Sequence, residues 1–223
     1  LKEDVDVEKV KAFASRTWRE LRYIPHIMFH PFDGFWDLKH EKRGSFSTAV
    51  ILLVLWMLSV ICTDQFTGFI LNYVETEKVN LFFRSLNVLL PFMVWTLSNW
   101  CITTLMEGEG TLKDIFITTA YASAPYSLIQ FLLIPLSNFI TLDESAFYTL
   151  FQSLGLIWFA FLFFCGLSTV HQFTPMKTVF TIILAFLGMV IILFLVMLFL
   201  YLVQSVISFV WLLLQEYHLH LNQ

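Results

Sequence analysis

This sequence has few charged residues. Only 13% of its 223 residues are Asp, Glu, Lys or Arg, whereas 58% are hydrophobic. Soluble domains carry roughly a quarter charged residues, so one water-soluble core could not bury the apolar surface of this chain. The composition therefore excludes an ordinary soluble domain and favours a helical protein embedded in lipid.

Paired cysteines and metal-ligand spacings are also missing. No CxxC or Cys/His spacing occurs, because the three cysteines lie far apart in apolar runs: Cys62, Cys101 and Cys165. This pattern excludes a disulfide framework and a zinc site. His26 and His30 have the spacing of a helical metal pair, but Pro25 and Pro31 leave little helix around them. We expect no metal and no cofactor.

Motifs of catalysis are absent too. The sequence has no glycine-rich phosphate loop, no Ser/His/Asp order and no Cys/His nucleophile. A proton relay usually needs ionisable side chains deep in the membrane, and the last three apolar segments contain none. We expect no catalytic residue and no enzymatic activity, and nucleic-acid binding has no support beyond a basic N-terminal helix face.

Long apolar segments are what the chain does have. A bilayer core of about 30 Å needs about 20 helical residues, and five segments reach that length. The sequence predicts an all-α integral membrane protein with a bundle of five transmembrane helices at about 48–66, 85–106, 115–139, 148–170 and 178–201. Apolar residues continue to Leu214, and we interpret 204–214 as an extension of the fifth helix or a helix on the outer surface.

Positive charge is concentrated at one end of the chain. Nine of the 13 Lys and Arg lie within residues 1–45, and an N-terminus inside the cell places Lys113 and Lys177 inside as well. Only Lys78 and Arg84 then lie outside. The positive-inside rule predicts a cytoplasmic N-terminus. We expect three regions: cytoplasmic 1–45, a membrane domain at 46–203 and an extracytoplasmic tail at 204–223.

The N-terminal region predicts a surface for binding. Apolar residues at three- and four-residue spacing give residues 1–25 one apolar helix face, and Pro25 is expected to end this amphipathic helix. Such a helix lies on an anionic leaflet or packs on another protein or on the bundle. An aromatic segment follows it at 29–36. The predicted membrane-surface or partner-binding residues are Arg16, Trp18, Arg19, Arg22, Phe35 and Trp36.

An acidic turn joins the second and third spans. Glu107 and Glu109 alternate with Gly108 and Gly110, and Asp114 opens the next helix. An acid at that position favours the positive end of the helix dipole by about 0.3–1 kcal/mol, so a plain loop with a cap is one interpretation. The other is a partner-docking site formed by Glu107 and Glu109.

Polar residues within the spans allow two interpretations. Asp64 lies near the end of the first span and Arg84 near the start of the second, on the same side of the membrane, so we predict an ion pair between them. Asn99 and Gln130 bond between helices or line a small cavity. A run of small residues, with Tyr121 inside it, precedes Pro125, where we expect a kink. This run packs closely against a neighbour, or it forms a hinge beside the cavity.

Several landmarks together resemble the Yip1-domain family in its bacterial form. They are Pro-Phe-Asp-Gly-Phe-Trp-Asp at 31–37, Asn-Trp at 99–100, the acidic turn and Ala-Tyr-Ala-Ser-Ala-Pro-Tyr at 120–126. The resemblance covers about residues 29–203. It implies five membrane helices with a cytoplasmic N-terminus and no known catalytic residue. It also implies that eukaryotic relatives act in vesicle traffic with Rab-type GTPases, and that some bacterial members are encoded near sugar-transporter components.

These patterns predict a non-enzymatic membrane scaffold or accessory protein that acts through protein and lipid contacts. The alternative is a subunit or accessory of a solute transporter, with a sugar as one candidate solute. The expected partners are the lipid bilayer and a membrane protein, with oligomer formation left open. We expect a multi-pass protein of the bacterial plasma membrane with its C-terminus outside.

Overall fold

The computed structural model describes residues 2–71 and 80–221, and this part of the chain is all helical, with no strand. The predicted fold class is therefore confirmed. In chain order the elements are α1 (Lys2–Leu21), α2 (Ile24–Phe29), α3 (Pro31–His40), α4 (Phe46–Phe66), α5 (Leu81–Leu105), α6 (Leu112–Ser137), the 3-10 helix η2 (Leu142–Glu144), α7 (Ser145–His171) and α8 (Pro175–Leu221).

Five of these helices, α4 to α8, are long and apolar enough to cross a membrane. Each corresponds to one of the five predicted spans, and the ends of α4 to α7 differ from the predicted ones by a few residues, whereas α8 continues to Leu221, well past the predicted end at 201. Three of the helices begin at a capped residue: Ser45 accepts from the Thr48 amide, Asn80 from the Phe82 amide and Thr111 from the Asp114 amide. Polar capping side chains fix these starts because they satisfy amides that have no partner within the helix.

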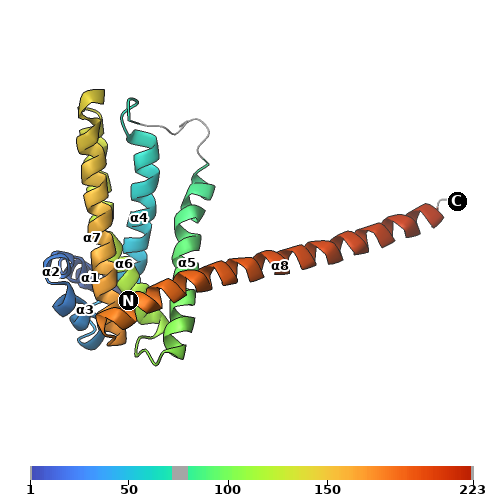
Figure 1. Cartoon of the computed structure of the whole chain (residues 1–223), viewed down its shortest axis with the longest axis horizontal. Helices are drawn as coiled ribbons and strands as arrows, with labels where there is room; N and C mark the ends of the chain where they lie inside the picture. The colour runs from blue at the N-terminus through green and yellow to red at the C-terminus, as the bar shows by residue number, and fades with distance from the viewer. Residues whose placement is uncertain (1, 72–79, 222–223) are drawn as a thin grey trace.

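Helix α6 lies at the centre of the bundle, packed between α4 and α7 (Figure 1). Its small residues from Thr118 to Ala124 are all buried, so the run does pack closely against its neighbours. Small side chains let helix backbones approach, which supplies the packing energy that the hydrophobic effect cannot supply in lipid. The helix continues without a break through Pro125 and Pro135.

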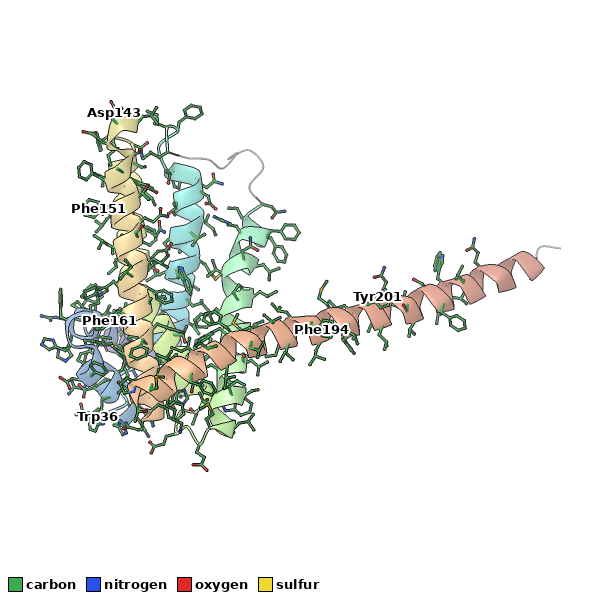
Figure 2. All side chains as sticks on the ribbon, in the orientation of Figure 1. Trp36, Asp143, Phe151, Phe161, Phe194 and Tyr201 are labelled. Atoms are coloured by element: carbon green, nitrogen blue, oxygen red, sulfur yellow. The ribbon has the colours of Figure 1, made fainter. Side chains whose placement is uncertain are left out.

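Helix α8 leaves the bundle at a wide angle to α4, α5 and α7, and its C-terminal end lies far from every other element (Figure 1). Its first turns pack on α5, where Ala185 is buried and its carbonyl accepts from Ser98 Oγ at 2.6 Å. Most of its apolar side chains from Val190 onward are exposed, among them Phe194 and Tyr201 (Figure 2). The segment from Gln204 continues the same helix, so the structure shows the extension rather than a separate surface helix.

The N-terminal helices pack beside one end of the bundle (Figure 1). Helix α1 contacts α4, α2 contacts α6, and α3 contacts α6 and α7. The prediction that Pro25 ends the first helix was wrong: α1 ends at Leu21, and Pro25 lies in the first turn of α2. Proline fits there because the first-turn amides need no helical partner. Pro31 begins α3 in the same way.

Candidate functional site

The predicted surface residues of α1 point outward. Arg16, Arg19 and Arg22 are exposed, and the side chain of Trp18 is 72% exposed. Thr17 and Glu20 lie on the other face and are buried. Helix α1 therefore packs on the bundle by one face and presents cations and an indole ring on the other.

Glu20 holds α1 to the beginning of α4. Its carboxylate is 6% exposed and accepts hydrogen bonds from Arg16 Nε (2.8 Å), the Ser45 amide (3.0 Å), Ser45 Oγ (2.5 Å) and Thr48 Oγ1 (2.6 Å). Burial alone would raise the pKa of Glu20, but the bonds from Ser45, Thr48 and Arg16 favour the charged form and lower that pKa. Sequence reasoning missed Glu20, although its four-residue spacing from Arg16 was a local signal.

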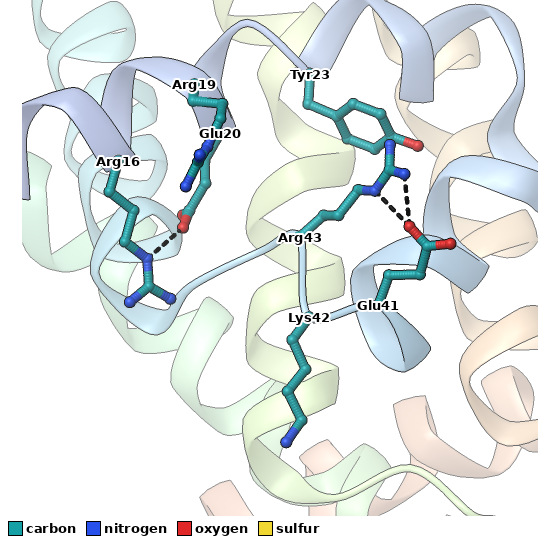
Figure 3. A pocket seen from close by; sticks show the side chains of 7 residues that line it. All are labelled: Arg16, Arg19, Glu20, Tyr23, Glu41, Lys42 and Arg43. Carbon is teal, nitrogen blue, oxygen red and sulfur yellow. Dashed lines mark hydrogen bonds and ion pairs between the residues drawn. The ribbon is translucent and has the colours of Figure 1, made fainter.

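A basic cleft opens beside this anchor, between α1 and the segment that joins α3 to α4. Its volume is about 460 Å³. Figure 3 shows side chains of α1 on one wall and those of the joining segment on the other. The residues that line the basic cleft are Arg16, Arg19, Glu20, Tyr23, Glu41, Lys42 and Arg43.

Tyr23 and Arg43 contact each other in the lining of the basic cleft. Arg43 donates to Glu41 at 2.6 Å, and its guanidinium carbon lies 5.2 Å from the centre of the Tyr23 ring. The bond to Glu41 raises the pKa of Arg43. Burial, with a hydrogen bond donated to Asp37, raises the pKa of Tyr23 to about 12. Tyr23 therefore stays neutral and Arg43 stays charged at physiological pH.

The aromatic segment has an inner and an outer side. Phe35 has no exposed surface, because it packs inside the core where α3 meets α6 and α7. A Cβ on Gly166 of α7 would lie only 3.1 Å from the Phe35 ring. Trp36 is 45% exposed and stacks on His40 at 4.5 Å between ring centres. Of these two predicted surface residues, only Trp36 presents a side chain to the surroundings.

The acidic turn connects to α3. Lys39 donates to Glu109 at 3.1 Å and to the Val170 carbonyl at 2.8 Å. Asp114 and Thr111 form a capping box at the start of α6, so the cap interpretation describes this acid. Glu107 is exposed and has a backbone φ of 59°. Docking of a partner through Glu107 and Glu109 stays a prediction.

The polar side chains predicted inside the bundle lie at different levels of it. Gln130 accepts from Thr63 Oγ1 of α4 at 3.2 Å, which is an interhelical bond. Asn99 is fully buried, and neither polar atom of its side chain has a partner in the described structure; the Tyr121 hydroxyl also has none there. Asn99 lies near the end of α5 that is close to α3, whereas Gln130 lies near the opposite end of α6. Pro125, on α6, is also buried.

At the other end of the bundle, Arg84 of α5 meets Asp64 of α4. Arg84 Nη2 donates to one carboxylate oxygen at 2.7 Å and Nε donates to the other, giving a two-point ion pair. Asp64 is buried, so the pair neutralises a carboxylate that would be costly to leave alone at this depth. No three metal-ligating side chains come together in the described parts of the chain.

Comparison with known proteins gives one match. Neither the curated proteins nor the solved structures yield a significant one. A family model described as the Yip1 domain matches residues 26–198, a range that begins in α2 and ends within α8. Because this match spans most of the chain and its five long apolar helices, the protein belongs to the Yip1 domain family.

Proposed function

We propose that the protein is a non-enzymatic membrane scaffold or accessory protein of the bacterial plasma membrane that works through its N-terminal helices. One observation carries this proposal. Glu20 and Phe35 fix α1 and α3 to the bundle, while Trp18 and its neighbouring arginines face outward. A surface that is already held in place can bind a partner without the entropic cost of becoming ordered on binding.

The proposed orientation has the N-terminus and the basic cleft in the cytoplasm. Lys113 and Lys177 support it, because both lie at the bundle end that carries α1 to α3. Arg84 lies at the other end, and Lys78, the second cation assigned to the outside, falls outside the described residues. This distribution agrees with the bias of cytoplasmic segments toward Lys and Arg.

Photocrosslinking in the native membrane tests this function. A photoreactive residue at Trp18, Trp36 or Glu109 is expected to capture a discrete protein, since all three are exposed at the proposed cytoplasmic end. Phe139, which is 85% exposed at the opposite end, provides the matched control. If all four positions gave the same products, or only lipid adducts, the scaffold proposal would fail.

A transporter accessory is the second candidate. The observation that favours it is Asn99, whose buried amide has no partner in the described structure. A polar group buried without a partner costs about 1–3 kcal/mol, and a bound solute would offset that cost. A solute-dependent rise in the melting temperature that is lost in Asn99→Leu supports this candidate, and a panel of sugars without any such rise counts against it.

A further inference from the structure

We propose that the basic cleft binds the phosphate of an anionic phospholipid whose acyl chain lies in the neighbouring apolar groove. This inference rests on the proposed function, because it names the lipid contact that the N-terminal surface makes. Three features carry it: the charge of the basic cleft, its level relative to the first span, and the groove beside it.

The basic cleft is lined by more cationic side chains than acidic ones. Arg16 is paired with Glu20 and Arg43 with Glu41. Arg19 and Lys42 line the same cleft, and the described part of the chain offers neither of them a carboxylate within ion-pair distance. Two unpaired cations, next to a paired guanidinium, suit a phosphate group, which accepts several charge-assisted hydrogen bonds at once.

The basic cleft lies at the level where phospholipid headgroups lie. Ser45 and Thr48, which bond to Glu20 at the edge of the cleft, are the N-cap and the first turn of α4, the first membrane span. The end of a span marks the boundary between the hydrocarbon core and the headgroups. The phosphate of a neighbouring lipid would therefore meet the cleft without leaving its leaflet.

An apolar groove of about 310 Å³ lies next to the basic cleft, lined by residues adjacent in sequence to cleft residues. Leu21 and Ile24 line it, each directly after a cleft residue, Glu20 and Tyr23. On α4 the groove is lined by Leu52 and Leu55. Thr48, Leu52 and Leu55 follow the helical i, i+4, i+7 pattern and share one face, so the groove begins about one turn deeper in the membrane than the Glu20 contact.

This pairing of cleft and groove distinguishes a phospholipid from a soluble phosphate ester. A soluble ester would use the cations alone and would leave the groove empty. A phospholipid satisfies both, because it carries an anionic headgroup and an apolar acyl chain in one molecule. The geometry therefore assigns an anionic lipid, of which phosphatidylglycerol is the probe.

The test measures lipid binding to the purified full-length chain in zwitterionic detergent, by native mass spectrometry during titration with phosphatidylglycerol or phosphatidylcholine. Arg19→Gln/Lys42→Gln is expected to weaken the first phosphatidylglycerol binding event about tenfold and to leave phosphatidylcholine unchanged. Lys11→Gln/Lys113→Gln, which removes two exposed cations outside the cleft, is expected to change it less than twofold. Arg19→Lys/Lys42→Arg keeps the charges and restores binding.

The possible results of this titration separate the lipid proposal from its alternatives. An equal loss in both double variants, or no loss in the first, overturns the proposal. Displacement of phosphatidylglycerol by an equal concentration of glycerol 3-phosphate overturns the lipid assignment in favour of a soluble ester. Melting temperature verifies that each variant folds. Retained lipid binding with no crosslinked protein would overturn the scaffold function alone, whereas a retained partner with no cleft-dependent lipid would overturn this inference alone.

Discussion

At the scale of single residues, Glu20 is the side chain on which the N-terminal region depends most. It is buried and accepts four hydrogen bonds, three of which link α1 to the start of α4. Glu20→Ala leaves Thr48 and the Ser45 amide without their acceptor, so we expect a loss of about 1–3 kcal/mol. Hydrogen exchange of α1 measures it, and Glu41→Ala, which removes an exposed acid, is the control expected to change α1 little.

The same residue predicts a dependence on pH. The pKa of Glu20 is lower in the folded protein than its ordinary value of 4.5. The stability that its charged form contributes is therefore complete above pH 4.5 and is lost as the pH falls below that value through the folded-state pKa. We expect exchange of α1 to rise in this acidic window. In Glu20→Gln this rise should shrink, and an unchanged rise would assign it to another group.

At the scale of elements, the neighbouring residues Phe35 and Trp36 differ in how much each holds α3 to the bundle. Phe35→Ala empties a buried site between α3, α6 and α7, and we expect a loss of about 3–5 kcal/mol that releases α3 from the bundle. Trp36→Ala removes a half-exposed ring and is expected to cost far less. Limited proteolysis of residues 22–45 compares the two. Equal cleavage rates would contradict the assignment of Phe35 to the core.

Helix α7 packs tightly against α6 and α3 at Gly166. A Cβ there would lie 2.5 Å from Thr118 Cγ2 and 3.1 Å from the Phe35 ring. We expect Gly166→Ala to cost about 1–3 kcal/mol, because overpacking forces neighbouring atoms apart. The melting temperature reports this change. Ser153→Ala, at an exposed position on the same helix, should leave it nearly unchanged.

Sequence patterns predicted the elements of this fold better than the contacts between them. The five apolar runs are local features, so the spans could be located from the sequence. Asp64 could be paired with Arg84 because either charge would be costly if it faced lipid without a partner. The contact of Glu20 with Ser45 spans 25 positions and leaves no periodic signal. Phe35 appeared in a segment with several aromatic rings, where composition could not separate the buried ring from the exposed ones.

At the scale of the whole molecule, orientation is the property most open to a direct test. We replace Cys62, Cys101 and Cys165 by Ser and introduce one cysteine at Glu107 or at Phe139, at opposite ends of the bundle. A membrane-impermeant thiol reagent added to intact cells is expected to label only Phe139→Cys. Labelling of Glu107→Cys instead would reverse the proposed orientation, and permeabilised cells should label both.

The length of α8 has a consequence for the lipids around it. Its apolar part runs from Pro175 to Leu212, which is about 57 Å at 1.5 Å per residue. The hydrocarbon core is about 30 Å thick, so the helix is hydrophobically mismatched far beyond what the usual tilt of about 20° corrects. The other four candidate spans are 21 to 30 residues long, so the largest excess of apolar length lies in α8, and the wide angle of α8 to the bundle is the response expected of a helix with such an excess. The tilt of α8 is therefore expected to depend on membrane thickness more than the tilt of any other span.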